Sequence, residues 1–127
     1  KMNLTAKKDF GYIIEAVNLN AILYDDKITV VEYIEKFKPA RFPRFYYLCY
    51  QIKMNGFIYN PLPLHKVDNT LCHIGGMLRL NACVELGYDS IDTIILDKKE
   101  DLMKLIKQQQ KTTHKYFPEH ILEPTER

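Results

Sequence analysis

The sequence lacks the features that tie a chain to a membrane or cross-link it outside the cell. No apolar run approaches the roughly 18 residues of a membrane-spanning helix, and the amino-terminal stretch is too polar and charged for a signal peptide. The three cysteines, Cys49, Cys72 and Cys83, are an odd number with no close pair, which suits reduced thiols. These absences predict a cytoplasmic protein with no membrane partner.

Excess charge of one sign is also lacking. The formal net charge is +2, which is too small to indicate nucleic-acid binding by overall electrostatic attraction. The chain has 127 residues, 46% of them hydrophobic, which is enough to bury a core without disulfides or a structural metal. We therefore expect a single domain over residues 1–127, with its core at about 12–97 and a carboxy-terminal helix and tail at 98–127.

The chain is organised around residues 73–88, which read HIGGMLRLNACVELGY. Apolar residues recur there at four-residue spacing and predict the buried face of a short amphipathic helix: Leu78, Ala82 and Leu86. Asn81 and Glu85 fall on the other side of this helix. Gly87 stands where a C-cap glycine would stand, and the β-branched segment 91–95 predicts a strand after it.

The glycine turn before this helix is a candidate anion site. Such a turn directs backbone N–H groups outward at a helix amino terminus, where the positive end of the dipole lies. Arg79, in the first turn, would add a fixed positive fork. The alternative is a purely architectural turn, because glycine-rich strand-to-helix turns are common and many bind nothing.

Residues 74–88, followed by 91–95, resemble the core of the ParB/sulfiredoxin-like superfamily, with this chain as a divergent member. That family carries a Gly-x-x-Arg phosphate-binding motif at the start of a helix, then an Ala, a Leu-Gly pair and a strand. The matching residues here are Gly76, Arg79, Ala82, Leu86 and Gly87. Upstream, residues 56–62 resemble the family's other signature, a glycine after a helix followed by a proline, here Pro61, that opens a strand. The resemblance covers about residues 52–96.

The resemblance implies an α+β fold, in which a small mixed β-sheet packs with helices and a glycine turn opens one helix. It also implies a nucleotide- or phosphate-binding domain linked to DNA transactions. The candidate ligand is a nucleoside triphosphate or diphosphate with Mg²⁺. Backbone N–H groups around Gly75, Gly76 and Met77 would hold phosphate and Arg79 would neutralise it. His73 would assist, and Pro61 would shape the base or sugar pocket.

The family's usual catalytic residues are replaced in this chain. Nuclease-like members often read Asp-Gly-His-His-Arg here, the partition-protein CTPases carry Glu and Arg between the Gly and the Arg, and sulfiredoxins carry a Cys after the second Gly. This chain has Met77 and Leu78 instead, which favours binding over catalysis. A divergent nuclease or phosphotransferase would need Glu85, His73 or Asp68 in a new role.

The alternative function is that of a DNA-associated accessory or scaffold protein. Nucleic-acid contacts would come from Arg41, Arg44, Lys53 and the carboxy-terminal lysines. A second anion contact near the glycine turn is a further interpretation of Arg41 and Arg44, but a solvated loop is favoured over it. The tyrosines at 46, 47 and 50 are interpreted as core and rim residues, because no basic residues interleave with them.

A metal site is not expected. Cys72 and His73 precede the turn, but alternation along a strand points them to opposite faces. His65 could meet His73 across a hairpin, yet the sequence contains no Cys-x-x-Cys or His-x-x-x-His pair to complete a ligand set.

The first half of the chain predicts short elements. Residues 1–10 have no clear period and suggest an arm, and the strand formers in 11–24 predict one long strand or two short ones. Thr29 and Glu32 fit a capping box that opens a helix at 30–37, although the β-branched residues at 28–33 are also compatible with a strand. Pro43 would lie in the first turn of a helix that continues over 44–55.

The remaining elements are also short. Prolines at 61 and 63 should confine the strand candidate at 57–64 to a sheet edge or to a strand's first residues, and 65–70 is a polar turn. A short strand is expected at 71–74, and a helix capped by Asp97 at 97–110. This helix, or the apolar tail at 116–122, could mediate a homodimer.

Overall fold

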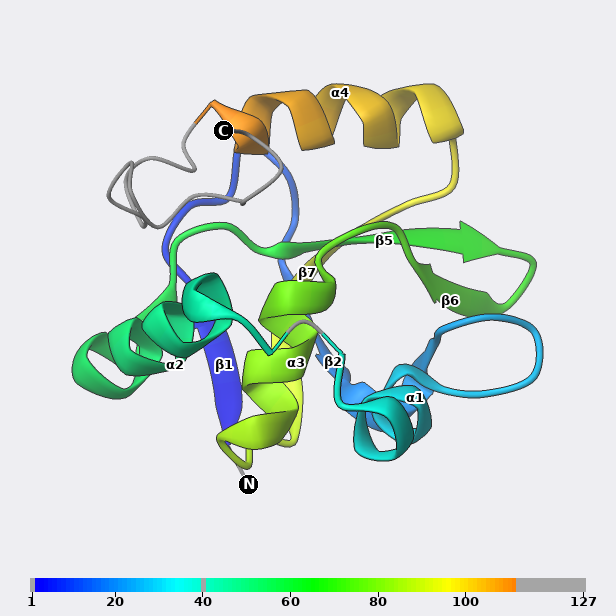
Figure 1. The fold of residues 1–127 in the computed structure, drawn as a ribbon. Coiled ribbons are helices and arrows are strands. Elements are labelled where there is room, and N and C mark those ends of the chain that lie inside the picture. The colour runs from blue at the N-terminus through cyan, green and yellow to red at the C-terminus, as the bar shows by residue number, and fades with distance from the viewer. Residues whose placement is uncertain (1, 40, 112–127) are drawn as a thin grey trace.

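The computed structural model describes residues 2–39 and 41–111. Figure 1 shows how the helices and strands are arranged in space. Their order is β1 (Asn3–Ala6), β2 (Glu15–Asn18), the 3-10 turn η1 (Leu19–Ala21), β3 (Ile22–Leu23), α1 (Val30–Phe37), α2 (Pro43–Asn55), β4 (Phe57–Ile58), β5 (Leu62–Val67), β6 (Thr70–His73), α3 (Met77–Glu85), β7 (Ser90–Leu96) and α4 (Lys99–Gln110).

Local capping signals set the bounds of α1 and α2. The Thr29 hydroxyl accepts from the Glu32 amide at 3.2 Å, and the Glu32 carboxylate accepts from the Thr29 amide at 2.9 Å, so the predicted capping box and helix are confirmed. The alternative of a strand over 28–33 is wrong, because this box satisfies the first helical N–H groups. Pro43 occupies the first turn of α2, as expected, and Gly56 ends that helix with a φ of 81°.

The strands form one mixed sheet in the order β3-β6-β5-β7-β1-β4, with β2 paired to β7. β7 runs parallel to β1 and β5 and antiparallel to β2. The prediction that residues 1–10 form an arm is wrong, because β1 lies between β7 and β4 and Leu4 is completely buried. Only four residues form β1, which is too short a stretch for a period of two to be recognised in the sequence.

Pro63 lies in an interior strand rather than at the sheet edge. It pairs with Ile94 of β7, while the pairing of β5 with β6 begins only at Leu64. No residue of β6 pairs with Pro63, so the N–H that proline lacks is not needed for a hydrogen bond to β6. Of the two positions expected for the proline, an edge strand or a strand's first residues, the structure shows the second. The polar turn expected over 65–70 is limited to residues 68–69, because β5 continues through Val67.

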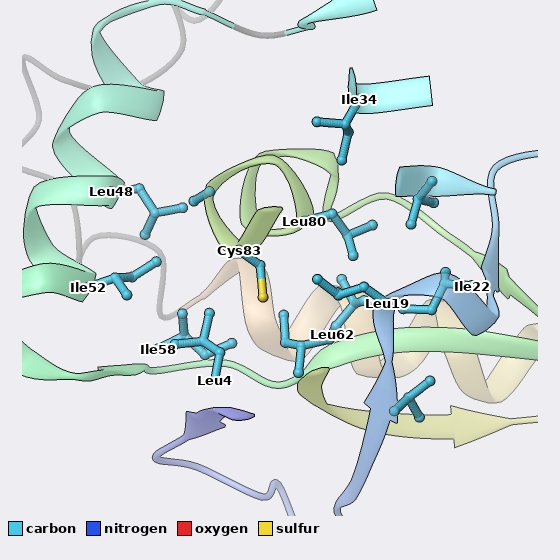
Figure 2. Close-up of a cluster of buried hydrophobic side chains, with 14 of the residues drawn as sticks. Leu4, Leu19, Ile22, Ile34, Leu48, Ile52, Ile58, Leu62, Leu80 and Cys83 are labelled. Carbon is cyan, nitrogen blue, oxygen red and sulfur yellow. The ribbon is translucent and has the colours of Figure 1, made fainter. Parts of the chain in front are cut away.

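The core lies between the sheet and α1, α2 and α3. Figure 2 shows part of this cluster, where Leu48 and Ile52 of α2 and Leu80 of α3 lie above strand residues such as Leu62. Because α3 contacts both α1 and α2, it is covered on more than one side. The expected outward position of Asn81 is therefore wrong: this residue is completely buried and its amide donates to the Pro39 carbonyl. Ala82 is fully buried as predicted, whereas Leu78 and Leu86 are only partly buried.

Helix α4 packs against β5 and β7, and in Figure 1 it lies above them, with α1–α3 below. It begins at Lys99 with Lys98 at the N-cap position and no side-chain cap, so the predicted cap at Asp97 is wrong. In the part of the chain that the structure describes, no helix combines the length and apolarity required to cross a membrane. The apolar tail at 116–122 lies outside the described residues.

Candidate functional site

The connection from β6 to α3 is built on two consecutive left-handed glycines. Gly75 has a φ of 67° and Gly76 a φ of 72°, a conformation that costs other residues steric strain. A Cβ on Gly76 would also overlap the Leu62 side chain, whereas a Cβ on Gly75 would meet nothing within 4 Å. Gly76 therefore needs to be glycine for both conformation and space, and Gly75 for conformation alone.

The amino terminus of α3 is open. Gly76 is its N-cap residue, and among the described residues no side chain caps the helix. The first N–H groups of a helix lack partners within it, and the dipole places positive potential at this end. Gly75 is exposed and Met77 is half-buried, so an anion can approach the turn from solvent.

Arg79 lies directly beneath this turn. A Cβ placed on Gly76 would stand 3.3 Å from Nη2 of Arg79. Nη1 of Arg79 donates to the carbonyl oxygens of Asn60 at 3.0 Å and Pro61 at 2.8 Å. The guanidinium thus adds positive charge under the turn and also holds the β4–β5 connection in place.

Gln109 of α4 completes this arrangement. Its side chain is 5% exposed, its Oε1 lies 3.5 Å from both Arg79 Nη atoms, and its Nε2 donates to the Pro61 carbonyl at 2.7 Å. The Asn60 amide donates to the backbone carbonyl of Gln109 at 3.3 Å. Sequence reasoning missed Gln109 and Asn60, because their role depends on α4 crossing β5, which no local pattern encodes.

His73 lies at the end of β6 beside the turn, and its Nδ1 is 3.3 Å from the Gly75 carbonyl oxygen. Its ring stacks on Tyr24 at a centroid distance of 5.2 Å, and Tyr24 stacks on Tyr33 of α1 at 3.8 Å with the planes 7° apart. The hydrogen bond with Tyr33 is the largest cause of a raised pKa at Tyr24. The turn is thus flanked by an aromatic column of His73, Tyr24 and Tyr33, and the two tyrosines were not identified from the sequence.

Arg41 lies at the other end of α3. Its guanidinium is 2.9 Å from the Glu85 carboxylate and sits 4.4 Å above the Phe45 ring. Because α3 has nine residues, its two ends are about 13 Å apart. Arg41 is therefore not beside the glycine turn, while Arg44 and Lys53 lie on α2.

The acids considered for catalysis also lie apart from the turn. Glu85 is engaged with Arg41, and Asp68 is exposed at the tip of the β5–β6 hairpin. Asp68 lies in the turn before β6 and His73 is the last residue of that strand, so the length of β6, roughly 10 Å, separates them. The structure thus brings Gly75, Gly76, Met77, Arg79, His73 and Pro61 together, and leaves both acids outside that group.

The possible metal ligands of the described residues are not clustered, and two of the cysteine thiols are buried or partly buried. No group of three His, Cys, Asp or Glu side chains that could hold a metal ion occurs among the described residues. Burial raises the pKa of the Cys83 thiol to about 12, and burial also raises the pKa of the Cys49 thiol. Both groups are therefore thiols rather than nucleophilic thiolates near neutral pH.

Comparison with solved structures identifies the fold. The crystal structure of sulfiredoxin from Arabidopsis thaliana matches with a TM-score of 0.54 and 20% sequence identity, covering 74% of this chain and 97% of that one. The predicted sulfiredoxin/ParB-like fold is thereby confirmed. No protein-family model and no curated protein matches the chain. At this level of identity the likeness extends to the fold alone.

Proposed function

We propose that this chain binds a phosphorylated ligand, a nucleoside di- or triphosphate with Mg²⁺, at the amino terminus of α3. The observation that carries the proposal is the pair of left-handed glycines, Gly75 and Gly76, before a helix with no side-chain cap. Backbone N–H groups at such a terminus are oriented to donate to phosphate oxygens. The Arg79 guanidinium beneath the turn adds positive charge at the same place.

The remainder of the ligand would lie toward His73. This ring sits beside the turn and is held by Tyr24 on one face, so it offers a fixed aromatic and polar surface to a base or sugar. Pro61 is buried, and its carbonyl oxygen accepts from Arg79 and Gln109. Its role is therefore to position Arg79 under the turn rather than to contact the base.

The residues at the turn support a function in ligand binding without catalysis. Met77 and Leu78 occupy the positions between Gly76 and Arg79, and neither side chain can transfer a proton or attack a phosphorus atom. Glu85, the acid within α3, is at the far end of the helix and paired with Arg41. Among residues 2–39 and 41–111, His73 is the one general base placed beside the turn.

The test is ligand-induced stabilisation in a matched pair of variants. Wild type, Gly75→Asp and Gly75→Asn would be heated with and without CTP, ATP, ADP and GTP in the presence of Mg²⁺. Both substitutions place a side chain of one size in open space and suit a left-handed residue comparatively well, but only aspartate opposes an incoming phosphate. At 100 times the dissociation constant a ligand adds about 2.7 kcal/mol, or roughly 10 °C for a domain of this size.

A shift in wild type and Gly75→Asn that is lost in Gly75→Asp supports the site. If no nucleotide shifts the wild type, the turn is architectural and the proposal fails. Arg79→Ala is a poorer probe, because it removes the hydrogen bonds to Asn60 and Pro61 and so changes stability without any ligand. The second function considered, contact with nucleic acid, requires a separate surface, and Arg44 and Lys53 both lie on α2.

A further inference from the structure

The buried face of α4 ends in a polar residue. Three side chains of this helix are buried, and their spacing of three and four positions places them on one face: Leu102, Leu105 and Gln109. The two leucines are completely buried, and the helix packs against β5 and β7. A buried glutamine loses its contact with water and needs hydrogen-bond partners inside the protein, whereas a leucine at the same position would need none. The reason for Gln109 therefore lies in the groups that it contacts.

Gln109 connects α4 to α3 through Arg79. The two helices lie on opposite sides of the sheet in Figure 1, and the two side chains meet at the connection between β4 and β5. The amide nitrogen of Gln109 is anchored to the Pro61 carbonyl at 2.7 Å, so its Oε1 is held 3.5 Å from each Nη atom of Arg79. Because a guanidinium is planar and rigid, contact with both Nη atoms fixes its orientation.

The two Nη atoms of Arg79 have different surroundings. Nη1 donates to the carbonyl oxygens of Asn60 and Pro61, whereas Nη2 is the atom that lies closest to the position of a Cβ on Gly76. Nη2 is thus the part of the guanidinium nearest to a phosphate held at the turn. Gln109 Oε1 contacts this atom, and because the glutamine is neutral, it orients Nη2 without cancelling its charge.

We propose that Gln109 is a positioning residue for the phosphate site, and that ligand binding at the turn and docking of α4 stabilise each other. The inference rests on the proposed function and names the helix that regulates it. A docked α4 holds Arg79 under the turn before the ligand arrives, which lowers the ordering cost of binding. By thermodynamic reciprocity, a bound ligand favours the docked helix by the same factor. Any partner or modification that displaces α4 would therefore weaken ligand binding at the turn.

Calorimetric titration with CTP, ATP, ADP and GTP, each with Mg²⁺, compares wild type with Gln109→Leu and Gln110→Leu. Gln109→Leu continues the apolar stripe of α4 and leaves the Pro61 carbonyl its hydrogen bond from Arg79, so the fold should persist. This variant should weaken nucleotide binding roughly fivefold to tenfold, the lower part of the usual range of coupling. Gln110→Leu makes the same chemical change at the next position, which is exposed, and should bind like wild type.

Hydrogen exchange of the α4 amides supplies a readout that a merely structural role would not move. A ligand slows exchange through a local opening only if that opening weakens ligand binding. Nucleotide should therefore slow exchange over residues 99–110 about fivefold to tenfold in wild type and Gln110→Leu, and should leave it unchanged in Gln109→Leu. The wild-type measurement tests the coupling even if Gln109→Leu fails to fold.

A destabilised variant separates the coupling from a general loss of stability. Ile52→Val removes a buried methyl group from α2, which lies on the other side of the sheet from α4 in Figure 1, and lowers the stability of the fold. It should bind nucleotides like wild type. A loss of affinity equal to that of Gln109→Leu would attribute both losses to reduced stability and overturn the inference.

The remaining outcomes distinguish the inference from the function on which it rests. Nucleotide binding by wild type that is unaffected by Gln109→Leu, or that leaves α4 exchange unchanged, would overturn the inference and leave the proposed function standing. Tighter binding by Gln109→Leu would overturn it too, since Gln109 would then withdraw Arg79 from the ligand. Absence of nucleotide binding by wild type would overturn both.

Discussion

Arg79 and Gln109 donate to the same acceptor, the carbonyl oxygen of Pro61, at 2.8 and 2.7 Å. The two residues are 30 positions apart and belong to α3 and α4. Their meeting point fixes the connection into β5 and links the carboxy-terminal helix to the residues under the glycine turn. A substitution of either residue should therefore change the hydrogen bonding of the other.

The link predicts a coupled loss of stability. Arg79→Ala leaves the Asn60 carbonyl without its charged donor and should lower the free energy of unfolding by roughly 2–3 kcal/mol. Gln109→Ala should also destabilise the protein, and the double variant should lose less than the sum of the two because the partners are shared. Urea unfolding of the four proteins measures this coupling. Strict additivity would show that the two side chains act independently.

The two glycines of the turn should respond differently to alanine. Gly75→Ala introduces only the strain of a left-handed alanine, about 1–2 kcal/mol. Gly76→Ala adds an overlap with Leu62 to the same strain and should cost roughly 1–3 kcal/mol more. Thermal or urea unfolding distinguishes them, and equal losses would contradict the described packing of Leu62 against the turn.

The stability of the capping box at α1 should depend on the hydroxyl group of residue 29 rather than on the size of its side chain. Thr29→Ala removes the hydroxyl that accepts from the Glu32 amide and should cost about 1 kcal/mol. Thr29→Ser keeps the hydroxyl and should stay within a few tenths of a kcal/mol of wild type. A similar loss in both variants would mean that the threonine methyl group, rather than the cap, stabilises the helix.

Cys83 should resist alkylation in the folded protein. Burial raises the pKa of its thiol from 9.0 to about 12, so at pH 8 only roughly one thiol in 10⁴ is ionised. Because the folded pKa lies above the unfolded one, this group contributes stability below about pH 9 and loses it as the pH rises toward 12. Mass spectrometry after iodoacetamide treatment, with and without urea, measures the protection. Fast labelling of Cys83 in the native state would contradict its burial.

The sequence by itself determined the local elements and the character of the turn. The capping box of Thr29 and Glu32, the proline that opens α2 and the glycine that ends it depend on neighbours within four residues, so short-range patterns predict them. The pair Gly75 and Gly76 before an amphipathic segment likewise predicted a turn that opens a helix, and its resemblance to the ParB/sulfiredoxin-like superfamily predicted the fold.

Only the tertiary structure decided which residues surround that turn. Asn3–Ala6 becomes an interior strand through partners more than 50 residues away, and Asn81 is buried because α1 and α2 cover the helix side that its spacing marks as exposed. Arg41 is drawn to Glu85 and away from the turn, while Gln109 is brought to Arg79. These placements follow from how helices cross the sheet, and crossing depends on the packing of side chains that are far apart in the sequence.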